Sequence, residues 1–483
     1  MPNFKKPRSY DYNLLVIGGG SAGLIAALIA ATVNAKVALV EKHLMGGDCL
    51  NTGCVPSKAL ISCAKKVYIA RSSGEFGLST SGDVDFTAVM AKVKGAIERI
   101  APNDSMERFQ GLGVDCFKGE ASFVDPWTVK IDEKRITAKN IVIASGATPF
   151  VPPIEGLDSI GALTSDTVWD LESLPPKLLV LGAGPIGCEL AQSFQRLGSQ
   201  VTLVDMAPRI LPNEDSDVAQ ILSDRLEKES VRLLTNSKAV AFREQAGERI
   251  MRIERDGDEQ DIPFDEVIVA VGRRAHTESL GLDALDIKLN PNGTIVVDDY
   301  QRTSLKHVYA CGDVAGPYQF THMASHQAWY SSVNALFGMF RKFRINYSVV
   351  PWCTFTDPEV ARVGLSEDSA AQQGIAVEVS RYDISDLDRA IAEGENAGFI
   401  KVLTHPGKDT VLGAVIVGPH AGELIMEFVL AMTHQLGLKK IMGTIHIYPT
   451  YSEMNKFVAS NWRKAHAPDK LLAMLPRLHK LFR

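Results

Sequence analysis

Hydrophobic residues near the start of the chain have the pattern of a buried strand, a tight turn and a helix. Residues 13–17 predict a fully buried strand, the glycine-rich residues 18–23 predict a turn, and the alanine-rich residues 24–33 predict a helix. Residues 36–40 are again apolar over the length of a strand. This order predicts a βαβ unit.

The same pattern returns farther along the chain. Residues 177–181 predict a buried strand, residues 182–187 a glycine turn, and residues 200–204 a second strand, with a helix to about residue 197 between them. Two βαβ units of one design predict two nucleotide-binding domains rather than one.

Both turns have the spacing G-x-G-x-x-G. Glycine is needed there because the backbone takes conformations closed to other residues, approaches a pyrophosphate, and lets the helix pack closely on the strand. An acid stands 23 positions after the first glycine in both units, Glu41 after Gly18 and Asp205 after Gly182. We expect these acids to accept hydrogen bonds from ribose hydroxyls. The alternative, that the glycines serve only a strand–helix turn, is weakened by the second copy.

The acid of the second unit also bears on the choice of nicotinamide cofactor. Asp205 would repel the 2′-phosphate of NADPH, so its presence favours NADH. Arg209 lies four residues farther on and could accommodate that phosphate, which leaves NADPH use open.

Strand and turn patterns divide the chain into parts. We expect the first nucleotide-binding domain at residues 1–150, the second at 151–277, a return to the first at 278–346, a third domain at 347–460 and a basic extension at 461–483. The third domain has no glycine motif. The expected fold class is α/β, with two Rossmann-like dinucleotide-binding domains and a C-terminal α+β domain. Further expected elements are strands at 267–271, 398–403 and 411–417, a strand followed by glycine at 308–313, and a helix at 422–436.

Composition and charge exclude several classes of protein. The chain has 483 residues, 46% of them hydrophobic and 22% charged, which indicates several folded domains rather than a disordered protein. Its 51 basic and 57 acidic residues leave a net charge of −6, so no overall positive field would attract nucleic acid.

Two of the seven cysteines stand apart from the others. Cys49 and Cys54 lie in the polar, glycine-rich run 46–58, whereas the remaining five are scattered through apolar stretches typical of buried thiols. Those five are Cys63, Cys116, Cys188, Cys311 and Cys353.

The spacing of the pair predicts a distorted helix. Five positions of straight helix would separate the two residues by ~7.5 Å along the axis, slightly beyond disulfide reach. Gly53 permits a distortion, and Pro56 suits the first turn of a following helix, which would place Cys54 at a helix N-terminus that stabilises a thiolate. Lys58 adds positive charge nearby. A structural disulfide or two inert thiols is the alternative.

One uncharged stretch, between Asp11 and Lys36, has the length of a transmembrane or signal segment. Its glycines are better explained by the nucleotide-binding turn. Because the cysteine pair also needs a reducing supply, the chain is expected to be cytoplasmic and without a transmembrane segment.

These motifs together resemble the FAD-dependent pyridine nucleotide disulfide oxidoreductases, which include dihydrolipoamide dehydrogenase, glutathione reductase and mercuric reductase. The resemblance extends from about Tyr12 to Lys456. It implies that the first unit binds FAD, that the second binds NAD(P)H, and that run 46–58 carries the redox-active disulfide. Residues 351–367 resemble the start of the family's dimerisation domain, which implies a homodimer.

The resemblance also implies cofactor-binding roles for a set of residues in each unit. For FAD they are Gly18, Gly20, Ser21, Ala22, Gly23, Glu41, Lys42, Gly47, Asp48, Lys58, Ser145, Gly146, Asp313 and Thr321. For NAD(P)H they are Gly182, Gly184, Ile186, Gly187, Glu189, Asp205 and Gly272.

Its implied chemistry is a relay from NAD(P)H through FAD to the Cys49–Cys54 disulfide. Cys54 would be the charge-transfer thiolate next to the flavin, and Cys49 the interchange thiol that meets the outer substrate. Glu189 would pair with Lys58 beside flavin N5.

The segment 446–453 departs from the pattern of the disulfide-reducing members. Their motif His-Pro-Thr-x-Ser-Glu supplies a base and its orienting carboxylate toward the interchange thiol of the other subunit. Here Glu453 is retained, but Tyr448 occupies the histidine position. Histidine titrates near 6.5 and tyrosine near 10, a difference of about 3.5 pKa units or ~5 kcal/mol, so Tyr448 is a poor base at neutral pH. His446 could replace it, although packing is the expected role.

This departure directs the choice of acceptor. Mercuric reductases also place an aromatic residue there and rely on thiolates that bind Hg(II) without a base. No cysteine follows Cys353, however, so their C-terminal cysteine pair is not expected, nor is an N-terminal metal-binding domain before Tyr12. We expect a thiophilic metal ion such as Hg(II), a quinone or an atypical disulfide as acceptor. Dihydrolipoamide dehydrogenase activity is disfavoured, and a redox-responsive regulator or electron-delivery partner is the alternative from another class.

The tail 461–483 carries six Lys or Arg against one Asp, a local charge of +5. Leu471, Leu475, Leu478 and Phe482 recur at helical spacing, and Pro476 would kink such a helix. We expect the tail to pack on the dimer surface. Contact with an anionic membrane or a partner protein is the alternative.

Overall fold

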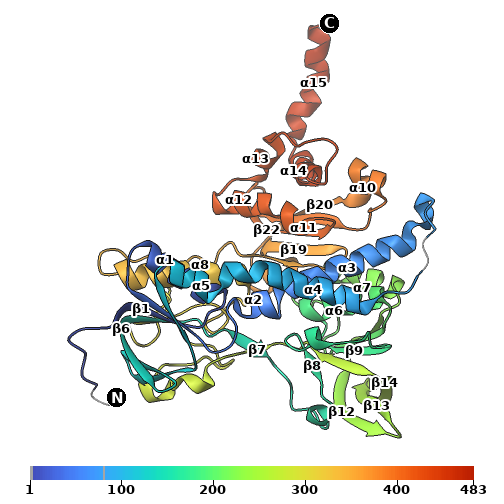
Figure 1. The fold of residues 1–483 in the computed structure, drawn as a ribbon. Helices are drawn as coiled ribbons and strands as arrows, with labels where there is room; N and C mark the ends of the chain where they lie inside the picture. The colour runs from blue at the N-terminus through green and yellow to red at the C-terminus, as the bar shows by residue number, and fades with distance from the viewer. Residues whose placement is uncertain (1–3, 80–81) are drawn as a thin grey trace. The chain divides into compact units, whose positions relative to one another are not determined.

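The computed structural model describes residues 4–79 and 82–483, which form two compact units. Of the described residues, one unit combines 4–79, 82–206 and 234–346, and the other combines 207–233 with 347–483 (Figure 1). This division by packing does not coincide with the domain boundaries expected from the sequence, which remain a prediction.

The first sheet of the larger unit is built on the first predicted βαβ unit. Parallel pairing joins β1 (Tyr12–Ile17) to β2 (Val37–Glu41) and to β6 (Lys134–Ile143). Leu14 and Val16 pack on one face with α1, whereas Leu15 and Ile17 pack on the other. A parallel strand buried on both faces reads as a continuous apolar run, which explains the sequence pattern. The sheet is completed by β3 (Val114–Lys118), β4 (Ala121–Asp125), β5 (Thr128–Ile131) and β17 (Val308–Ala310).

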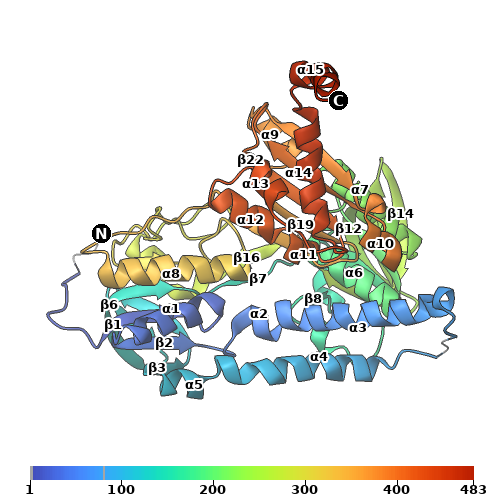
Figure 2. The ribbon, with the colours of Figure 1, turned by 90° about the horizontal axis from the view of Figure 1, so that it is seen from above.

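Helices cover this sheet and carry the chain toward the second one. The helices α1 (Ser21–Thr32) and α8 (Thr321–Phe337) pack against each other. The long helices α3 (Cys54–Ser72) and α4 (Phe86–Ile100) lie side by side (Figure 2). Two short helices belong to the same region, α2 (Gly47–Asn51) and α5 (Met106–Gly111).

The second parallel sheet repeats the first in a smaller form. Its strands run in the order β11 (Arg232–Leu234), β10 (Gln200–Val204), β9 (Lys177–Leu181), β15 (Glu266–Val269) and β8 (Leu163–Thr164). The helix α6 (Pro185–Leu197) comes after its glycine turn, as predicted. Antiparallel strands that periodicity did not reveal complete the unit: β12 (Lys238–Gln245), β13 (Glu248–Arg255) and β14 (Asp258–Phe264) in one sheet, and β7 (Ala147–Pro149) with β16 (Arg273–Ala275) in another.

The smaller unit has an antiparallel sheet covered by helices. The strand order is β18 (Pro351–Thr354), β19 (Glu359–Gly364), β22 (Val411–Gly418), β21 (Phe399–Thr404) and β20 (Glu378–Asp383). The helices assigned to this part of the chain are α7 (Ser216–Lys228), α9 (Glu367–Gln372), α10 (Asp388–Glu393), α11 (Ala421–Leu424), α12 (Met426–Thr433), α13 (Leu438–Gly443), α14 (Glu453–Ala465) and α15 (Asp469–Leu481). The α/β fold class with a C-terminal α+β part is thereby confirmed.

The single helix expected at 422–436 is wrong in detail. The chain forms α11 and α12 with Ile425 between them, because Phe428 N–H donates to the Ile425 carbonyl over three residues rather than four. The helix then ends at Thr433, and Gln435 takes a left-handed conformation.

A buried lysine ties α7 to the sheet of the smaller unit. Lys401 in β21 is 2% exposed, and its Nζ lies 2.9 Å from Asp215, 2.9 Å from Asp217 and 2.7 Å from Glu367. A buried ammonium ion needs such partners. Residues 207–233 are thus held to the sheet by charge as well as by packing.

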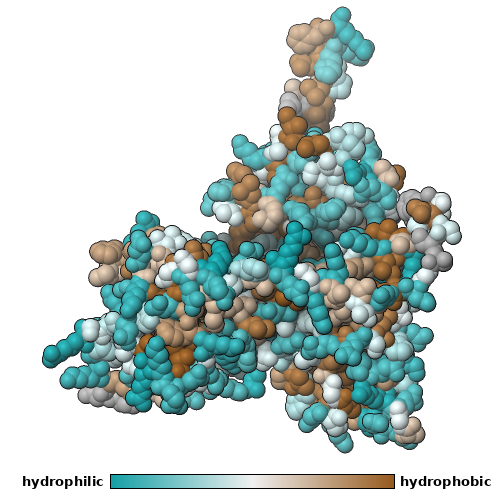
Figure 3. All heavy atoms as spheres, viewed as in Figure 1, coloured by the Kyte–Doolittle hydropathy of each residue, from teal (hydrophilic) through white to brown (hydrophobic). Residues whose placement is uncertain are grey.

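Within the described residues, no helix combines the length and apolar character required to cross a bilayer. The uncharged stretch after Asp11 forms β1, the glycine turn and α1. The first residues of the tail, 461–465, belong to α14, and its later part forms α15, which continues through Pro476. Leu472 and Leu478 are exposed on it, as is Phe482 just after its end, and Figure 3 shows both apolar and polar side chains at its surface. The side chain of Leu471 lies outside the described part.

Candidate active site

The first glycine turn is shaped by two close backbone approaches. Gly18 has a φ of +106°, and a Cβ there would lie 2.3 Å from the Ala144 carbonyl oxygen. A Cβ at Gly23 would lie 1.7 Å from the Gly18 carbonyl oxygen, so only glycine lets α1 start at this point. Glu41 accepts a hydrogen bond from Gly19 N–H at 2.6 Å, which holds its carboxylate at the turn.

The second turn has nearly the same geometry. Gly182 has a φ of +107°, and a Cβ at Gly187 would lie 1.8 Å from the Gly182 carbonyl oxygen. Asp205 accepts a hydrogen bond from Ala183 N–H at 2.6 Å. Ile186, in the first turn of α6, is 37% exposed, and Gly272 has a φ of +139° in the turn after β15. Both acids therefore sit beside the amide groups that a dinucleotide pyrophosphate would meet.

The cysteine pair lies at a break between two helices. Helix α2 ends at Asn51 and α3 begins at Cys54, with Gly53 as the N-cap. A Cβ at Gly53 would meet Asp48 Oδ2 at 2.9 Å, so glycine allows the chain to turn sharply there. The break agrees with the predicted distortion and leaves Cys54 in the first turn of α3, where amide groups and the helix dipole favour a thiolate.

Both cysteines are present as thiols, and their surroundings separate their acidities. A hydrogen bond from Cys49 lowers the pKa of Cys54 to about 6; burial opposes this, while Thr321 and Lys58 support it. The Cys54 sulfur lies 3.2 Å from Thr321 Oγ1 at the start of α8. The same contact with Cys54, together with burial, raises the pKa of Cys49. Of the two, Cys54 therefore holds the negative charge.

Lys58 and Glu189 meet as the resemblance implied. Lys58 Nζ lies 2.9 Å from Glu189 Oε2, and the Glu189 side chain is 6% exposed. Lys58 comes from α3, one turn after Cys54, and Glu189 comes from α6. The ion pair therefore links the helix of the redox pair to the helix of the second glycine turn.

A buried carboxylate lies near the redox segment. Burial raises the pKa of Asp313 to about 6; Arg273 opposes the rise, and Asp48 adds to it. Arg273 Nε lies 3.7 Å from Asp313 and makes no hydrogen bond within the described structure, while its NH2 group lies 3.3 Å from Asp48. A buried donor without a partner beside a buried acid indicates a place for a polar ligand.

The other expected FAD residues surround the same turn. Gly20 forms a bridge with Gly46, and a Cβ at Gly47 would lie 2.6 Å from Gly20 Cα. Ser145 donates to the His276 carbonyl at 2.7 Å, and Gly146 has a φ of +71°. Ser21 and Ala22 open α1, and Lys42 is exposed after β2. Their cofactor roles remain predictions.

The segment with Tyr448 is arranged differently from the expected base and orienting carboxylate. Tyr448 is 67% exposed and donates to Asp388 Oδ2 at 2.9 Å, which raises the pKa of the phenol. Glu453 instead accepts from Thr450 N–H at 3.3 Å. The residue that contacts the phenol is therefore Asp388 of α10.

His446 is held by two neighbours. Its Nδ1 donates to the Thr444 carbonyl at 3.0 Å, and its Nε2 lies 3.2 Å from Glu427 Oε2. The side chain is 5% exposed. Both nitrogens are thus occupied, which favours the packing role expected for this residue.

Sequence reasoning missed Asp388, Glu427 and the bridging position of Arg273. Arg273 comes after a strand and glycine of the kind that preceded other site residues, so its position offered a signal. Asp388 and Glu427 are ordinary helix acids whose contacts come from distant parts of the chain, and no local pattern identifies them.

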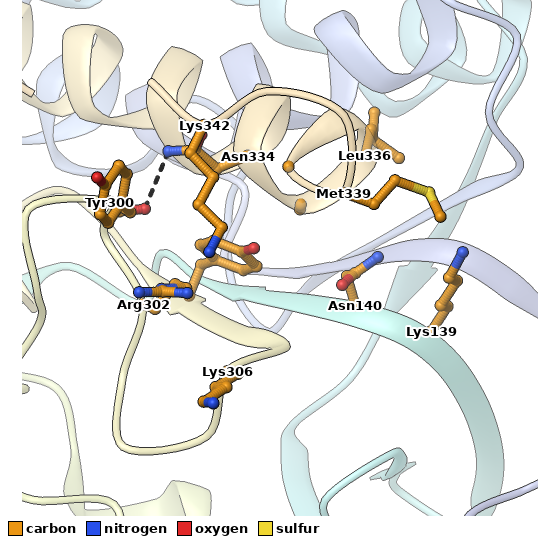
Figure 4. Close-up of a pocket in the computed structure, with 12 residues that line it drawn as sticks. Lys139, Asn140, Tyr300, Arg302, Lys306, Asn334, Leu336, Met339 and Lys342 are labelled. Carbon is orange, nitrogen blue, oxygen red and sulfur yellow. Dashed lines mark hydrogen bonds between the residues drawn. The ribbon is translucent and has the colours of Figure 1, made fainter. Parts of the chain in front are cut away.

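A basic hollow lies at the other end of α8. It has a volume of about 230 Å³, and its cations include Lys139, Arg302, Lys306 and Lys342 (Figure 4). Asn334, which also lines it, donates to the Tyr300 carbonyl at 3.2 Å. None of the expected site residues lines this hollow, which is ~20 Å from Thr321 along the helix.

Comparison with protein families agrees with this geometry. The family model described as pyridine nucleotide-disulphide oxidoreductase matches residues 12–328, and the model of its dimerisation domain matches residues 350–458. The chain belongs to the pyridine nucleotide-disulphide oxidoreductase family. Members of this family are NAD(P)H-dependent FAD enzymes, so the chain is an oxidoreductase that uses FAD and NAD(P)H.

Individual members of the family resemble the chain over most of its length. Dihydrolipoyl dehydrogenase of Chlamydia muridarum is 35% identical over 92% of this chain and 95% of its own. Mercuric reductase of Lysinibacillus sphaericus is 34% identical over 94% of this chain and 83% of its own. The HOCl-induced flavoprotein disulfide reductase RclA of Escherichia coli, a solved structure, has a TM-score of 0.83 and 26% identity, over 93% of this chain and 99% of its own.

The residues present fit the family's cofactor. The glycine turn leaves amide groups open for a pyrophosphate, Glu41 stands beside it for a ribose, and Asp313 with Arg273 offers an acceptor and a donor inside the protein. These groups would hold FAD next to Cys54.

Proposed function

We propose that this oxidoreductase transfers electrons from NAD(P)H to a thiophilic metal ion through Cys49 and Cys54. The observation that carries the proposal is Tyr448, whose phenol donates to Asp388 and has a raised pKa. Such a phenol keeps its proton at neutral pH, so Tyr448 does not supply the base that dithiol–disulfide exchange uses.

When it is bound, FAD would supply the chemistry that turns a hydride from NAD(P)H into an electron pair for the disulfide. The chain's own residues give the two sulfur atoms different roles. Cys54 carries the negative charge because Cys49 and Thr321 hydrogen-bond to it and Lys58 is near. Cys49 keeps its proton and is the thiol proposed to meet the acceptor.

The proposed step is balanced for a one-electron acceptor such as Cu(II). Two Cu(II) ions take one electron each, Cys49 and Cys54 form an S–S bond, and the Cys49 proton passes to solvent. Thiolate sulfur binds soft metal ions directly, so this step needs no general base. With Hg(II), one ion would take both electrons.

Two relatives support a metal acceptor. Mercuric reductases are among the similar proteins, and a solved structure of RclA is a Cu(II) complex, 25% identical with a TM-score of 0.82 over 92% of this chain and 98% of its own. We extend this chemistry to the present chain as part of the proposal.

The proposed assembly is a homodimer, which the dimerisation domain supports. In it, Tyr448 and Glu453 would reach Cys49 of the partner subunit. A monomer by light scattering at micromolar concentration would contradict this arrangement. A cytoplasmic location is also a proposal, motivated by a redox-type cysteine pair that needs a reducing supply, and fractionation of cells tests it.

The function is tested by anaerobic turnover with NADH and three acceptors. We expect Cu(II) and Hg(II) to be reduced and lipoamide to be reduced slowly, with Cu(I) detected by a chelator that absorbs visible light. Cys49→Ser should abolish metal reduction. Tyr448→His should raise lipoamide reduction at least ~10-fold, because it restores a base.

Fast lipoamide reduction by the wild type, with no metal reduction, would contradict the proposed acceptor. A redox-responsive regulator is the alternative. It predicts no acceptor turnover and a protein contact that depends on the oxidation state of Cys49 and Cys54.

The tail offers a separate contact that we propose to lie on the dimer surface. Apolar residues of α15 are exposed in the single chain, among them Leu472, Met474 and Leu481. Removal of residues 468–483 should weaken the dimer. If the dimer is unchanged and only binding to anionic vesicles is lost, the membrane alternative holds instead.

A further inference from the structure

Two histidines lie one turn apart at the start of α8. His322 and His326 are both exposed and occupy positions i and i+4, which places them on the same helix face with Cβ atoms ~6 Å apart. Aromatic neighbours contact both rings, Phe320 stacking on His322 at 5.3 Å and Tyr330 meeting His326 edge-on at 5.0 Å between ring centroids. Imidazoles in this spacing on a helix can bind one metal ion together.

The helix start that carries the two histidines contacts the redox segment through Thr321. Thr321, the residue before His322, has its hydroxyl 3.2 Å from the Cys54 sulfur.

We propose that His322 and His326 form a binding site for Cu(II) and similar divalent ions beside the redox pair. The inference rests on the proposed function, because the site would bind the metal acceptor before its reduction. Imidazole nitrogen suits Cu(II), whereas thiolate sulfur prefers Cu(I) and Hg(II), so reduction and transfer to sulfur favour each other. Two nitrogen ligands with water in the other positions also release an ion readily.

No electron moves at this site. Cu(II) exchanges two bound waters for two imidazole nitrogens, and later exchanges the nitrogens for sulfur. Its reduction then takes place in the dithiol step of Cys49 and Cys54, with electrons that come from NAD(P)H.

The site is tested by electron paramagnetic resonance of the FAD-loaded, oxidised enzyme with one equivalent of Cu(II). We expect hyperfine coupling to two imidazole nitrogens in the wild type and in the Cys49→Ser, Cys54→Ser double variant, since sulfur is not required. The His322→Gln, His326→Gln double variant should lose this coupling and bind Cu(II) at least ~10-fold more weakly. His405→Gln, which changes an exposed histidine after β21, is the matched control and should bind as the wild type does.

Equal binding and equal nitrogen coupling in the wild type and the double histidine variant would overturn the site. The single variant His326→Gln covers the case in which the double variant does not fold, because loss of one nitrogen already changes the spectrum. Turnover separates the two proposals. Nitrogen-bound Cu(II) that NADH never reduces overturns the proposed function and keeps the site, whereas Cu(I) formation with an unchanged KM for Cu(II) in the double variant overturns its role in loading.

Discussion

The two glycine turns have the same backbone and different surroundings. Gly18 and Gly182 differ by one degree in φ, and each acid accepts a hydrogen bond at 2.6 Å from the amide of the residue after that glycine. At the first turn, however, Gly47 of the redox segment approaches Gly20 closely, and a Cβ on Gly47 would lie 2.6 Å from the Cα of Gly20. At the second, a Cβ on Gly184 would meet nothing within 4 Å.

This difference shows what a repeated motif does and does not determine. The motif sets the turn and the position of the acid. The function of each copy depends on the segment that comes after it in the chain. After Glu41 the chain forms the redox segment, whereas after Asp205 it continues into residues 207–233, which pack with the smaller unit.

The largest effects are expected from alanine at the third glycine of each motif. Gly23→Ala and Gly187→Ala place a methyl group 1.7 and 1.8 Å from a carbonyl oxygen. Overpacking of this kind costs about 3 kcal/mol. Gly23→Ala should lose FAD and unfold at lower temperature. Gly187→Ala should keep FAD and lose reduction by NADH, measured by flavin absorbance and stopped flow. Loss of FAD in both variants would show that the two turns do not act independently.

The next prediction compares Gly47, where a Cβ would clash with Gly20, with Gly184, where a Cβ would have room. Gly47→Ala introduces a clash at a φ of +58° and should lower the free energy of unfolding by about 1–3 kcal/mol. Gly184→Ala has room and a φ of −73°, so its unfolding temperature should equal that of the wild type while its KM for NADH rises. Thermal unfolding of the FAD-loaded proteins checks both, and equal destabilisation would remove the distinction.

The Cys54 thiolate, in the redox segment beside the first turn, should titrate with a pKa below that of an ordinary cysteine. In the two-electron-reduced enzyme, the long-wavelength thiolate–flavin absorbance should be present at neutral pH and disappear as the pH falls through about 6, the pKa of Cys54. The absorbance is lost toward acid because the depressed pKa keeps the thiolate only above that pH. Cys49→Ala removes the main hydrogen bond and should move the midpoint upward, whereas Cys49→Ser keeps a donor and should move it less. A midpoint near 9 in the wild type would refute the assigned acidity.

The smallest effect concerns nucleotide choice at the second turn. Arg209 donates to Asp368 Oδ2 and to the Glu214 carbonyl, so it is already engaged, and Asp205 should decide for NADH. Asp205→Ser should shift the ratio of kcat/KM toward NADPH by about tenfold, ~1.4 kcal/mol. Arg209→Ala should leave that ratio nearly unchanged, and a fall in NADPH use in this variant would assign the phosphate contact to Arg209.

Local pattern predicted the parts of the fold that depend on neighbouring residues. The strands at 177–181 and 200–204 have the expected bounds, and the break at Gly53 was visible from the cysteine spacing and Pro56. The hairpin strands β12 to β14 were not foreseen, because their exposed faces give little apolar pattern.

The site was predictable only where its residues carry a motif. Glu41, Cys54 and Lys58 stand in recognisable spacing. Asp388 and Tyr448 are 60 positions apart in the chain, and no local sequence pattern around either residue predicts their contact. Contacts of this kind depend on tertiary packing, which a single sequence does not display.

The buried Lys401 bears on how this chain could be recombined with its relatives. Its carboxylate partners Asp215 and Asp217 precede it by more than 180 positions. Between them and Lys401 the chain returns to the first sheet as β17. A chimera joined at residue 346 would keep the lysine from one parent and its counter-charges from the other. Exchangeable modules in this architecture are therefore discontinuous: residues 207–233 must be inherited together with 347–483.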